Sequence, residues 1–190
     1  NLKVVDHPDA GARKWLAASP FMFAAFASRN DVVTRLGGGV PGFANVVSEG
    51  RLRIPTTMID DPVSAHIGDG FGSLFLVPTI GETLRVNGRV AAIDGEAIEI
   101  AIEECYIHCA KALIRSEFWK AQPGADVPQD VAAFLAASRF IALATADAQQ
   151  HADVSPKGDP AGKFVRFEDN AVLFADRPGN RRADSFRNVL

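Results

Sequence analysis

The chain has 190 residues, of which 47% are hydrophobic, and its formal net charge at pH 7 is −3. This length and this composition are typical of one ordinary globular domain or two small ones with a real hydrophobic core. The nearly neutral charge gives no indication of a nucleic-acid partner or of binding to an anionic membrane surface.

Membrane and export signals are not evident in the sequence. No apolar run approaches the roughly 20 residues that a membrane-spanning helix needs, and the first residues lack the apolar region of a signal peptide. The two cysteines, Cys105 and Cys109, are four positions apart, which suits free thiols in a reducing compartment better than a disulfide framework. We therefore expect a soluble cytoplasmic protein.

The first half of the chain combines one short helix with several strands. A helix is predicted from about Asp9 to Ala18. The segment 71–77 is apolar on both faces apart from Ser73, which predicts a buried central strand. Asn87-Gly88 predicts a bulge or turn in a later strand. The remaining strands are predicted at 20–27, 32–36, 43–47, 52–54, 83–90 and 98–102.

A long helix is predicted from about Glu103 to Trp119, followed by a linker and a second helix from Pro128 to Ser138. The first of these helices would place Glu104, His108, Lys111 and Arg115 on one face. That face is either an ordinary polar surface or a set facing a substrate, with His108 as an acid or base. A metal site at Cys105, His108 and Cys109 would need a fourth ligand, and none is evident.

The most informative stretch runs from Asp153 to Asn188. Asp153, Ser155 and Lys157 alternate along a predicted strand, so their side chains share one polar face that we expect to meet water or a ligand. A turn and an apolar hairpin follow, and then a helix start that carries Arg181 and Arg182. Such an arrangement suits a phosphate, whereas the simpler alternative is a solvated helix start with surface ion pairs.

Two parts of the chain resemble each other. Leu16–Ser19 followed by a phenylalanine is matched by Leu135–Ser138 followed by a phenylalanine. We interpret this as a decayed tandem repeat, with a first unit at 1–125 and the front half of a second at 126–190. Leu36 would then stand at the place of Lys157. A circular permutation would produce a similar order of motifs.

Four segments together resemble the pyridoxamine 5′-phosphate oxidase-like flavoproteins. They are DVSPKGDPAGKFVRF (153–167), VLFADRPGNRRADSFRN (172–188), GSLFLVPTIGETLRVNGRV (72–90) and EECYIHCAKALIRSEFW (103–119). The resemblance implies an α+β, mainly β fold: a split β-barrel with peripheral helices that binds FMN, often across a homodimer. The order of the segments differs from a simple family member, because the phosphate segment comes last.

The resemblance also implies which residues meet the cofactor. Ser155 and Lys157 would lie beside the flavin, Arg181 and Arg182 would grip its phosphate, and Thr83 would lie near the ring. The full set of residues assigned to FMN is Ser155, Lys157, Asp176, Arg177, Asn180, Arg181, Arg182 and Thr83.

The expected function is that of an FMN-dependent oxidoreductase with a small-molecule substrate that the sequence does not name. No residue is indicated as a required acid or base, so no catalytic residue is predicted. The alternatives are a flavin-binding or stress-response module without turnover, and a barrel that binds haem or a deazaflavin.

Overall fold

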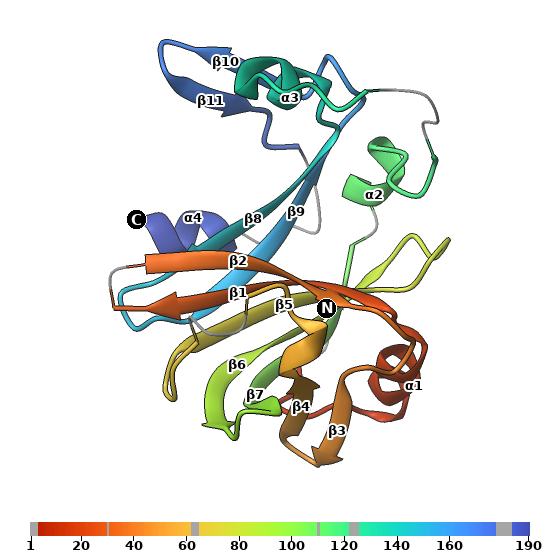
Figure 1. The fold of residues 1–190 in the computed structure, drawn as a ribbon, viewed down its shortest axis with the longest axis vertical. Coiled ribbons are helices and arrows are strands. Elements are labelled where there is room, and N and C mark those ends of the chain that lie inside the picture. Colours follow the sequence, from red (N-terminus) through yellow and green to blue (C-terminus); the bar gives the residue numbers. More distant parts are fainter. Residues whose placement is uncertain (1–3, 30, 62–64, 110, 122–125, 178–183) are drawn as a thin grey trace.

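The computed structural model describes residues 4–29, 31–61, 65–109, 111–121, 126–177 and 184–190 (Figure 1). Strands predominate over helices, which confirms the predicted α+β, mainly β class. The strands are β1 (Phe21–Ser28), β2 (Asp31–Gly38), β3 (Asn45–Ser48), β4 (Arg51–Pro55), β5 (Gly70–Leu76), β6 (Thr83–Ile93), β7 (Ala97–His108), β8 (Phe140–Ala146), β9 (Ala152–Gly158), β10 (Val165–Glu168) and β11 (Ala171–Phe174). The helices are α1 (Ala10–Ala18), α2 (Lys111–Arg115), α3 (Val131–Ala137), α4 (Asp184–Val189) and the 3₁₀ turn η1 (Thr56–Met58). Within these ranges, no helix has the length and apolar character needed to cross a membrane.

The first part of the chain forms a seven-stranded antiparallel sheet in the order β2-β1-β5-β6-β7-β4-β3. Its core includes Phe71 and Phe75 of β5, Leu52 and Ile54 of β4, and Ile100 of β7, all fully shielded from solvent. Every residue of β5 is buried, as its two apolar faces predicted. The sequence therefore placed the central strand correctly.

The predicted bulge at Asn87-Gly88 is confirmed, because the pairing of β6 with β7 shifts register there. A Cβ atom on Gly88 would collide with the carbonyl oxygen of Ala101, so the close approach of the two strands requires glycine at this position. The bulge bends the strand that carries Arg85, and Arg85 is central to the site described below.

The predicted helix from Glu103 to Trp119 is wrong over its first half. β7 continues to His108, and its backbone pairs with β6 from Ile98 to that residue. The backbone N–H and C=O groups of residues 103–108 are therefore satisfied by pairing between strands and not by hydrogen bonds within a helix. The helix α2 is confined to Lys111–Arg115. Glu104 and His108 therefore lie on a strand and share no helical face with Lys111 and Arg115.

A second set of elements repeats the order of the first. α3, β8, β9, β10 and β11 follow one another as α1, β1, β2, β3 and β4 do. Asp9 and Asp130 cap the two helices by accepting hydrogen bonds from backbone N–H groups in the first turn. Gly42 and Gly162 adopt nearly the same left-handed conformation, with φ of 76° and 75°, in the turns after β2 and β9. We call α1–β7 the first unit and α3–β11 the second unit.

The strand pairing corrects one predicted equivalence between the units. β1 pairs with β2 so that Met22 faces Gly37, and β8 pairs with β9 so that Ile141 faces Lys157. Both hairpins follow directly on the matched helices, so the counterpart of Lys157 is Gly37 rather than Leu36. The first unit therefore has no side chain at the position of Lys157.

The β8–β9 hairpin lies against the sheet of the first unit (Figure 1). Gly70 and Gly72 of β5 permit this approach, because a Cβ atom on either would collide with the backbone of the segment 150–153. Apolar contacts join Leu74 and Leu76 of β5 to Val154 of β9. This packing brings the polar residues of β9 against β6.

Candidate functional site

The polar face of β9 is directed partly into the protein and not to solvent. Asp153 is only 4% exposed, and Ser155 and Lys157 are partly buried. The expectation that the whole face meets water or a ligand is therefore wrong for Asp153. Burying a carboxylate without a partner would be costly, and the partner is a cation from the first unit.

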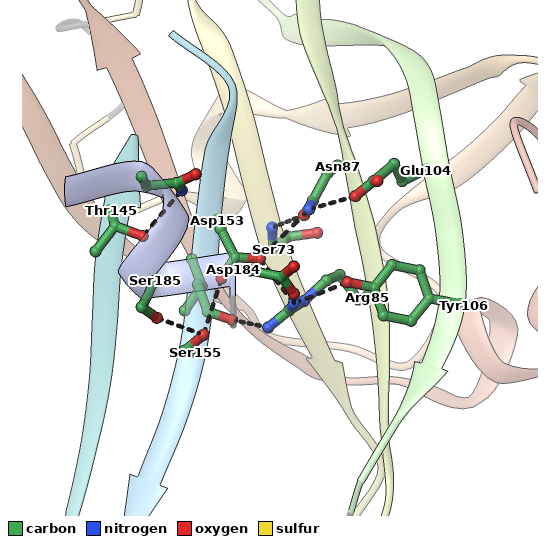
Figure 2. A network of polar contacts seen from close by, with 12 residues as sticks. Ser73, Arg85, Asn87, Glu104, Tyr106, Thr145, Asp153, Ser155, Asp184 and Ser185 are labelled. Carbon is green, nitrogen blue, oxygen red and sulfur yellow. Dashed lines mark hydrogen bonds and ion pairs between the residues drawn. The ribbon is translucent and has the colours of Figure 1, made fainter. Parts of the chain in front are cut away.

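That cation is Arg85 of β6, which is completely buried (Figure 2). Its Nη1 atom lies 2.8 Å from a carboxylate oxygen of Asp153 and 3.1 Å from one of Asp184 at the start of α4. Its Nη2 atom donates to the carbonyl oxygen of Val154 at 2.6 Å. One guanidinium group thus holds a strand and a helix of the later part of the chain against the first sheet.

Tyr106 of β7 completes the surroundings of Arg85. Its hydroxyl oxygen accepts a hydrogen bond from Nη1 of Arg85 at 2.8 Å, and the guanidinium carbon lies 5.5 Å from the centre of its ring. Burial raises the pKa of Tyr106 to about 12, so its hydroxyl keeps its proton at neutral pH. The group is a fixed neutral partner and not a base.

Asn87 of β6 links this cluster to β5 and β7, the strands that pair with β6 on either side (Figure 2). Its side-chain oxygen accepts from the backbone N–H of Ser73, and its side-chain nitrogen donates to Glu104 at 3.2 Å. The same nitrogen lies 3.5 Å from Asp153. Glu104, which the sequence suggested as part of a helical face, therefore belongs to a network between strands.

A cavity of about 380 Å³ opens beside this network, between β6–β7 and the later part of the chain. Five of its lining residues carry carboxylates, and most of these have a partner: Asp153 and Asp184 contact Arg85, Asp147 contacts His151, and Glu103 contacts Arg89. The lining includes Glu103, Glu104, Asp147, Asp153, Asp184 and Arg187. Acidic residues outnumber basic ones in this lining, which favours a neutral or cationic ligand over a phosphate.

Lys157 and Arg177, two basic residues that the sequence analysis assigned to the cofactor, lie near the end of β9 that is distant from Asp153. Lys157 is four residues after Asp153, about 13 Å further along the strand, and its ammonium group lies 2.7 Å from the carboxylate of Asp176. The side chain of Lys157 is 17% exposed and that of Asp176 is 50% exposed, so solvent reaches this ion pair. An anion that approached Lys157 from solution would have to displace only this one exposed carboxylate.

Arg177 is engaged differently from Lys157. Its Nε atom donates to the carboxylate of Asp159 at 2.6 Å, and the side chain of Asp159 is only 5% exposed. Arg115 of α2 lies 3.4 Å from the same carboxylate and donates to the carbonyl oxygen of Gly158 at 2.9 Å. Arg177 thus balances a buried acid, which makes it a residue that positions the turn.

Two described residues that follow β11, one on each side of residues 178–183 in sequence, contact β9. Asp176 lies before the segment and pairs with Lys157, and Ser185 lies after it and donates to the hydroxyl of Ser155 at 3.0 Å. Ser155 in turn donates to Asp153 at 2.8 Å. The other predicted residues of this motif, Asn180, Arg181 and Arg182, lie outside the described residues.

Thr83, the residue expected near a flavin ring, begins β6 and is completely buried. Its hydroxyl group has no hydrogen-bond partner among the described residues. A buried hydroxyl without a partner is uncommon and carries an energetic cost, which marks this end of β6 as a place where a further polar group would be stabilising. No described contact joins Thr83 to Ser155 or Lys157.

The cysteines do not form a reactive pair in the structure. Cys105 is buried within β7, where burial raises the pKa of its thiol to about 12. A thiol with this pKa is protonated and unreactive at neutral pH. Within the described parts of the chain, no three His, Cys, Asp or Glu side chains lie close enough together to hold a metal ion.

Sequence reasoning missed the residues that organise the site, namely Arg85, Tyr106 and Asp184. One signal was available: position 85 is a charged residue between the apolar Leu84 and Val86 of a predicted strand, and a charge that such a strand buries requires a partner. Its partners lie 68 and 99 positions away in sequence, and no local pattern identifies them. No family model, curated protein or solved structure matches this chain.

Proposed function

We propose that this chain binds FMN and holds the phosphate of FMN beside β9. The observation that carries the proposal is the attachment of Asp176 to Lys157 and of Ser185 to Ser155. Arg181 and Arg182 lie between Asp176 and Ser185 in the sequence. Arginine and lysine are the usual partners of phosphate in proteins, so a site at this strand suits a dianion.

The described residues divide into two roles. Lys157 would bind the phosphate directly, exchanging the exposed carboxylate of Asp176 for a group of higher charge. Ser155 would hold α4 beside this lysine, because its hydroxyl donates to Asp153 and accepts from Ser185. Arg177, which is paired with the buried Asp159, would hold the turn in place without contacting the ligand.

Bound FMN would supply the redox chemistry, and the protein would supply binding, orientation and charge. We infer an FMN-dependent oxidoreductase whose substrate is a small molecule and which functions as a homodimer.

The test is a fluorescence titration of the purified chain with FMN and with riboflavin, which lacks the phosphate. The intact chain should bind FMN at least tenfold more tightly than riboflavin. The variants Lys157→Met and Arg181→Ala/Arg182→Ala should each lose tenfold or more in FMN affinity, since a hydrogen bond to a charged group contributes about 1.5–3 kcal/mol. Riboflavin affinity should change little.

Lys163→Met is the matched control, because Lys163 is an exposed lysine in the turn after β9. It should leave both affinities unchanged. Equal affinity for FMN and riboflavin, or no uptake of either, would contradict the phosphate site. A photometric assay of the FMN-loaded protein with NADH and NADPH then separates an oxidoreductase from a flavin-binding module without turnover.

A further inference from the structure

The cavity of about 380 Å³ beside the Arg85 network has walls from three separate parts of the chain. One wall comes from β6 and β7, one from the β8–β9 hairpin and one from α4. We call it the acidic cavity, and its lining includes Gly88, Glu103, Glu104, Asp147, His151, Asp153 and Asp184. It is distinct from the proposed phosphate site, because Lys157 lies about 13 Å along β9 from Asp153.

The charges on these walls do not balance within the described parts of the chain. The five carboxylates of the lining contact three arginines, namely Arg85, Arg89 and Arg187. With histidine counted as neutral, two negative charges remain in excess. Glu104 is the carboxylate of this lining that no described basic side chain contacts. The electrostatic potential of the cavity therefore attracts a positive charge.

Glu104 is held in place by an amide group and not by a cation (Figure 2). Nδ2 of Asn87 donates to one of its carboxylate oxygens at 3.2 Å, and Asn87 is only 8% exposed. The two residues also face each other in the pairing of β6 with β7, so the carboxylate has a fixed position. Its second oxygen has no partner among the described residues. A partly buried carboxylate with a free oxygen is stabilised by a cationic donor.

His151 offers a second acceptor from the β8–β9 hairpin. Its Nδ1 atom lies 2.7 Å from the carboxylate of Asp147, which also accepts from the backbone N–H groups of Gln149 and His151. Because a carboxylate can only accept, Nδ1 carries the hydrogen in this contact. Nε2 of the neutral ring is then an acceptor, and no described contact occupies it. The cavity thus has free acceptors on two of its walls.

We propose that the acidic cavity binds a small organic cation with an ammonium or guanidinium group. Such groups have several N–H donors and no acceptor, so they complement the acceptors of Glu104 and His151. The volume of about 380 Å³ lies within the usual range for small-molecule sites, roughly 300–1,000 Å³. A metal ion suits the cavity less well, since no three ligand side chains lie close enough together within the described residues. The proposal does not depend on FMN binding.

The probe is agmatine, which has a guanidinium group at one end of a short carbon chain and an ammonium group at the other. The comparison compound is 4-guanidinobutyrate, which has a carboxylate at the second end. Backbone amide chemical shifts of the isotope-labelled chain, without FMN, are followed as each compound is added. Agmatine should bind at least tenfold more tightly than 4-guanidinobutyrate. It should shift the amide signals of Gly88, Glu104 and Ala152, which line the cavity, but not that of Lys157.

Glu104→Gln should weaken the binding of agmatine at least fivefold, because it removes the charge while its amide oxygen still accepts from Asn87. His151→Phe should weaken it at least threefold, since phenylalanine keeps a ring but has no acceptor. The matched control is Glu99→Gln on the same strand. Glu99 pairs with Arg53 and lies outside the lining of the cavity, so its replacement should leave the affinity for agmatine unchanged.

A preference for agmatine that Glu104→Gln reduces and Glu99→Gln does not reduce supports the proposal. The proposal is overturned if the two compounds bind equally, if agmatine does not bind at millimolar concentrations, or if the two glutamine variants weaken binding alike. Because the titration contains no FMN, its result is separate from the test of the phosphate site. A chain that binds agmatine but not FMN would contradict the phosphate site alone.

Discussion

The two units have the same order of elements but different burial. In the first unit, α1–β4 surround β5, β6 and β7, and β5 is buried throughout. In the second unit, β11 is mostly exposed and β8 is only half buried. The capping aspartates and the turns at Gly42 and Gly162 are nevertheless alike. Local structure in this chain is therefore set by short segments, whereas burial depends on strands distant in sequence.

The units also differ in charge at the position of Lys157, the residue proposed to bind the phosphate. Lys157 of β9 has Gly37 as its counterpart, so the first unit has no cation there. The second unit combines this lysine with partly exposed apolar residues, whereas the first combines a buried core with a strand that has no cation at the matched position. The first unit thus acts as the support, and Arg85 attaches β9 to it.

The largest effect is expected from Arg85→Met, which removes the buried ion pairs and the hydrogen bond by which β6 holds β9 and α4. Asp153 and Asp184 would lose their buried cation, and such a loss costs about 3–5 kcal/mol. We expect faster amide exchange in β8, β9 and α4 together with a lower free energy of unfolding in urea. Arg89→Met on the same strand is the control; its exposed contacts, with Glu103 and with the carbonyl oxygen of Gln149, should together contribute at most about 1 kcal/mol. Equal effects of the two substitutions would contradict the network.

Leu52→Ala and Val172→Ala test the difference in burial at matched positions. Leu52 is fully buried, so its truncation should lower the free energy of unfolding by about 2–5 kcal/mol. Val172 is 42% exposed, so its truncation should cost less than about 1 kcal/mol. Urea denaturation measures both. Similar losses would mean that β11 is buried in solution.

Ser19→Ala and Ser138→Ala test the same difference with the smallest possible change of side chain. Ser19 bonds to a buried carbonyl of β5, and its removal leaves that acceptor with one partner fewer, at a cost of about 1–2 kcal/mol. Ser138 bonds to an exposed carbonyl of its own helix and should cost about 0.5 kcal/mol or less. Thermal unfolding of the two variants should rank them in this order, and the reverse order would contradict the role of β5.

Gly42→Ala and Gly162→Ala test the local similarity of the units. Both glycines have φ near 75°, a conformation that costs alanine about 1 kcal/mol. At Gly42 the new methyl group would also lie 3.3 Å from the carbonyl oxygen of Ala17, whereas Gly162 has open space. Gly42→Ala should therefore be slightly more destabilising in urea. A stabilising effect at either position would contradict the shared turn geometry.

Most elements could be predicted from the sequence because their signals are local. The alternation at Asp153, Ser155 and Lys157, the apolar segment of β5 and the bulge at Asn87-Gly88 each depend on adjacent residues. The helix predicted from Glu103 failed because its residues fit a helical spacing as well as a strand. Pairing with β6 decided the outcome, and that pairing depends on residues far away in the sequence.

The site was predicted less completely than the fold. The sequence indicated that Ser155 and Lys157 share a face, but not that Asp153 would be buried against Arg85. It suggested Arg177 as a residue near the cofactor, whereas its partner in the structure is Asp159. Contacts of this kind join elements that meet only after the sheet has formed, so spacing along the chain does not reveal them.

The most direct test of the account is amide hydrogen exchange of the chain with and without saturating FMN. We predict new protection in β9 and α4, which carry Lys157 and Ser185, and no change in β2 at the matched position, Gly37. Protection at β2, or bound FMN that leaves the exchange of β9 and α4 unchanged, would contradict a phosphate site on the second unit.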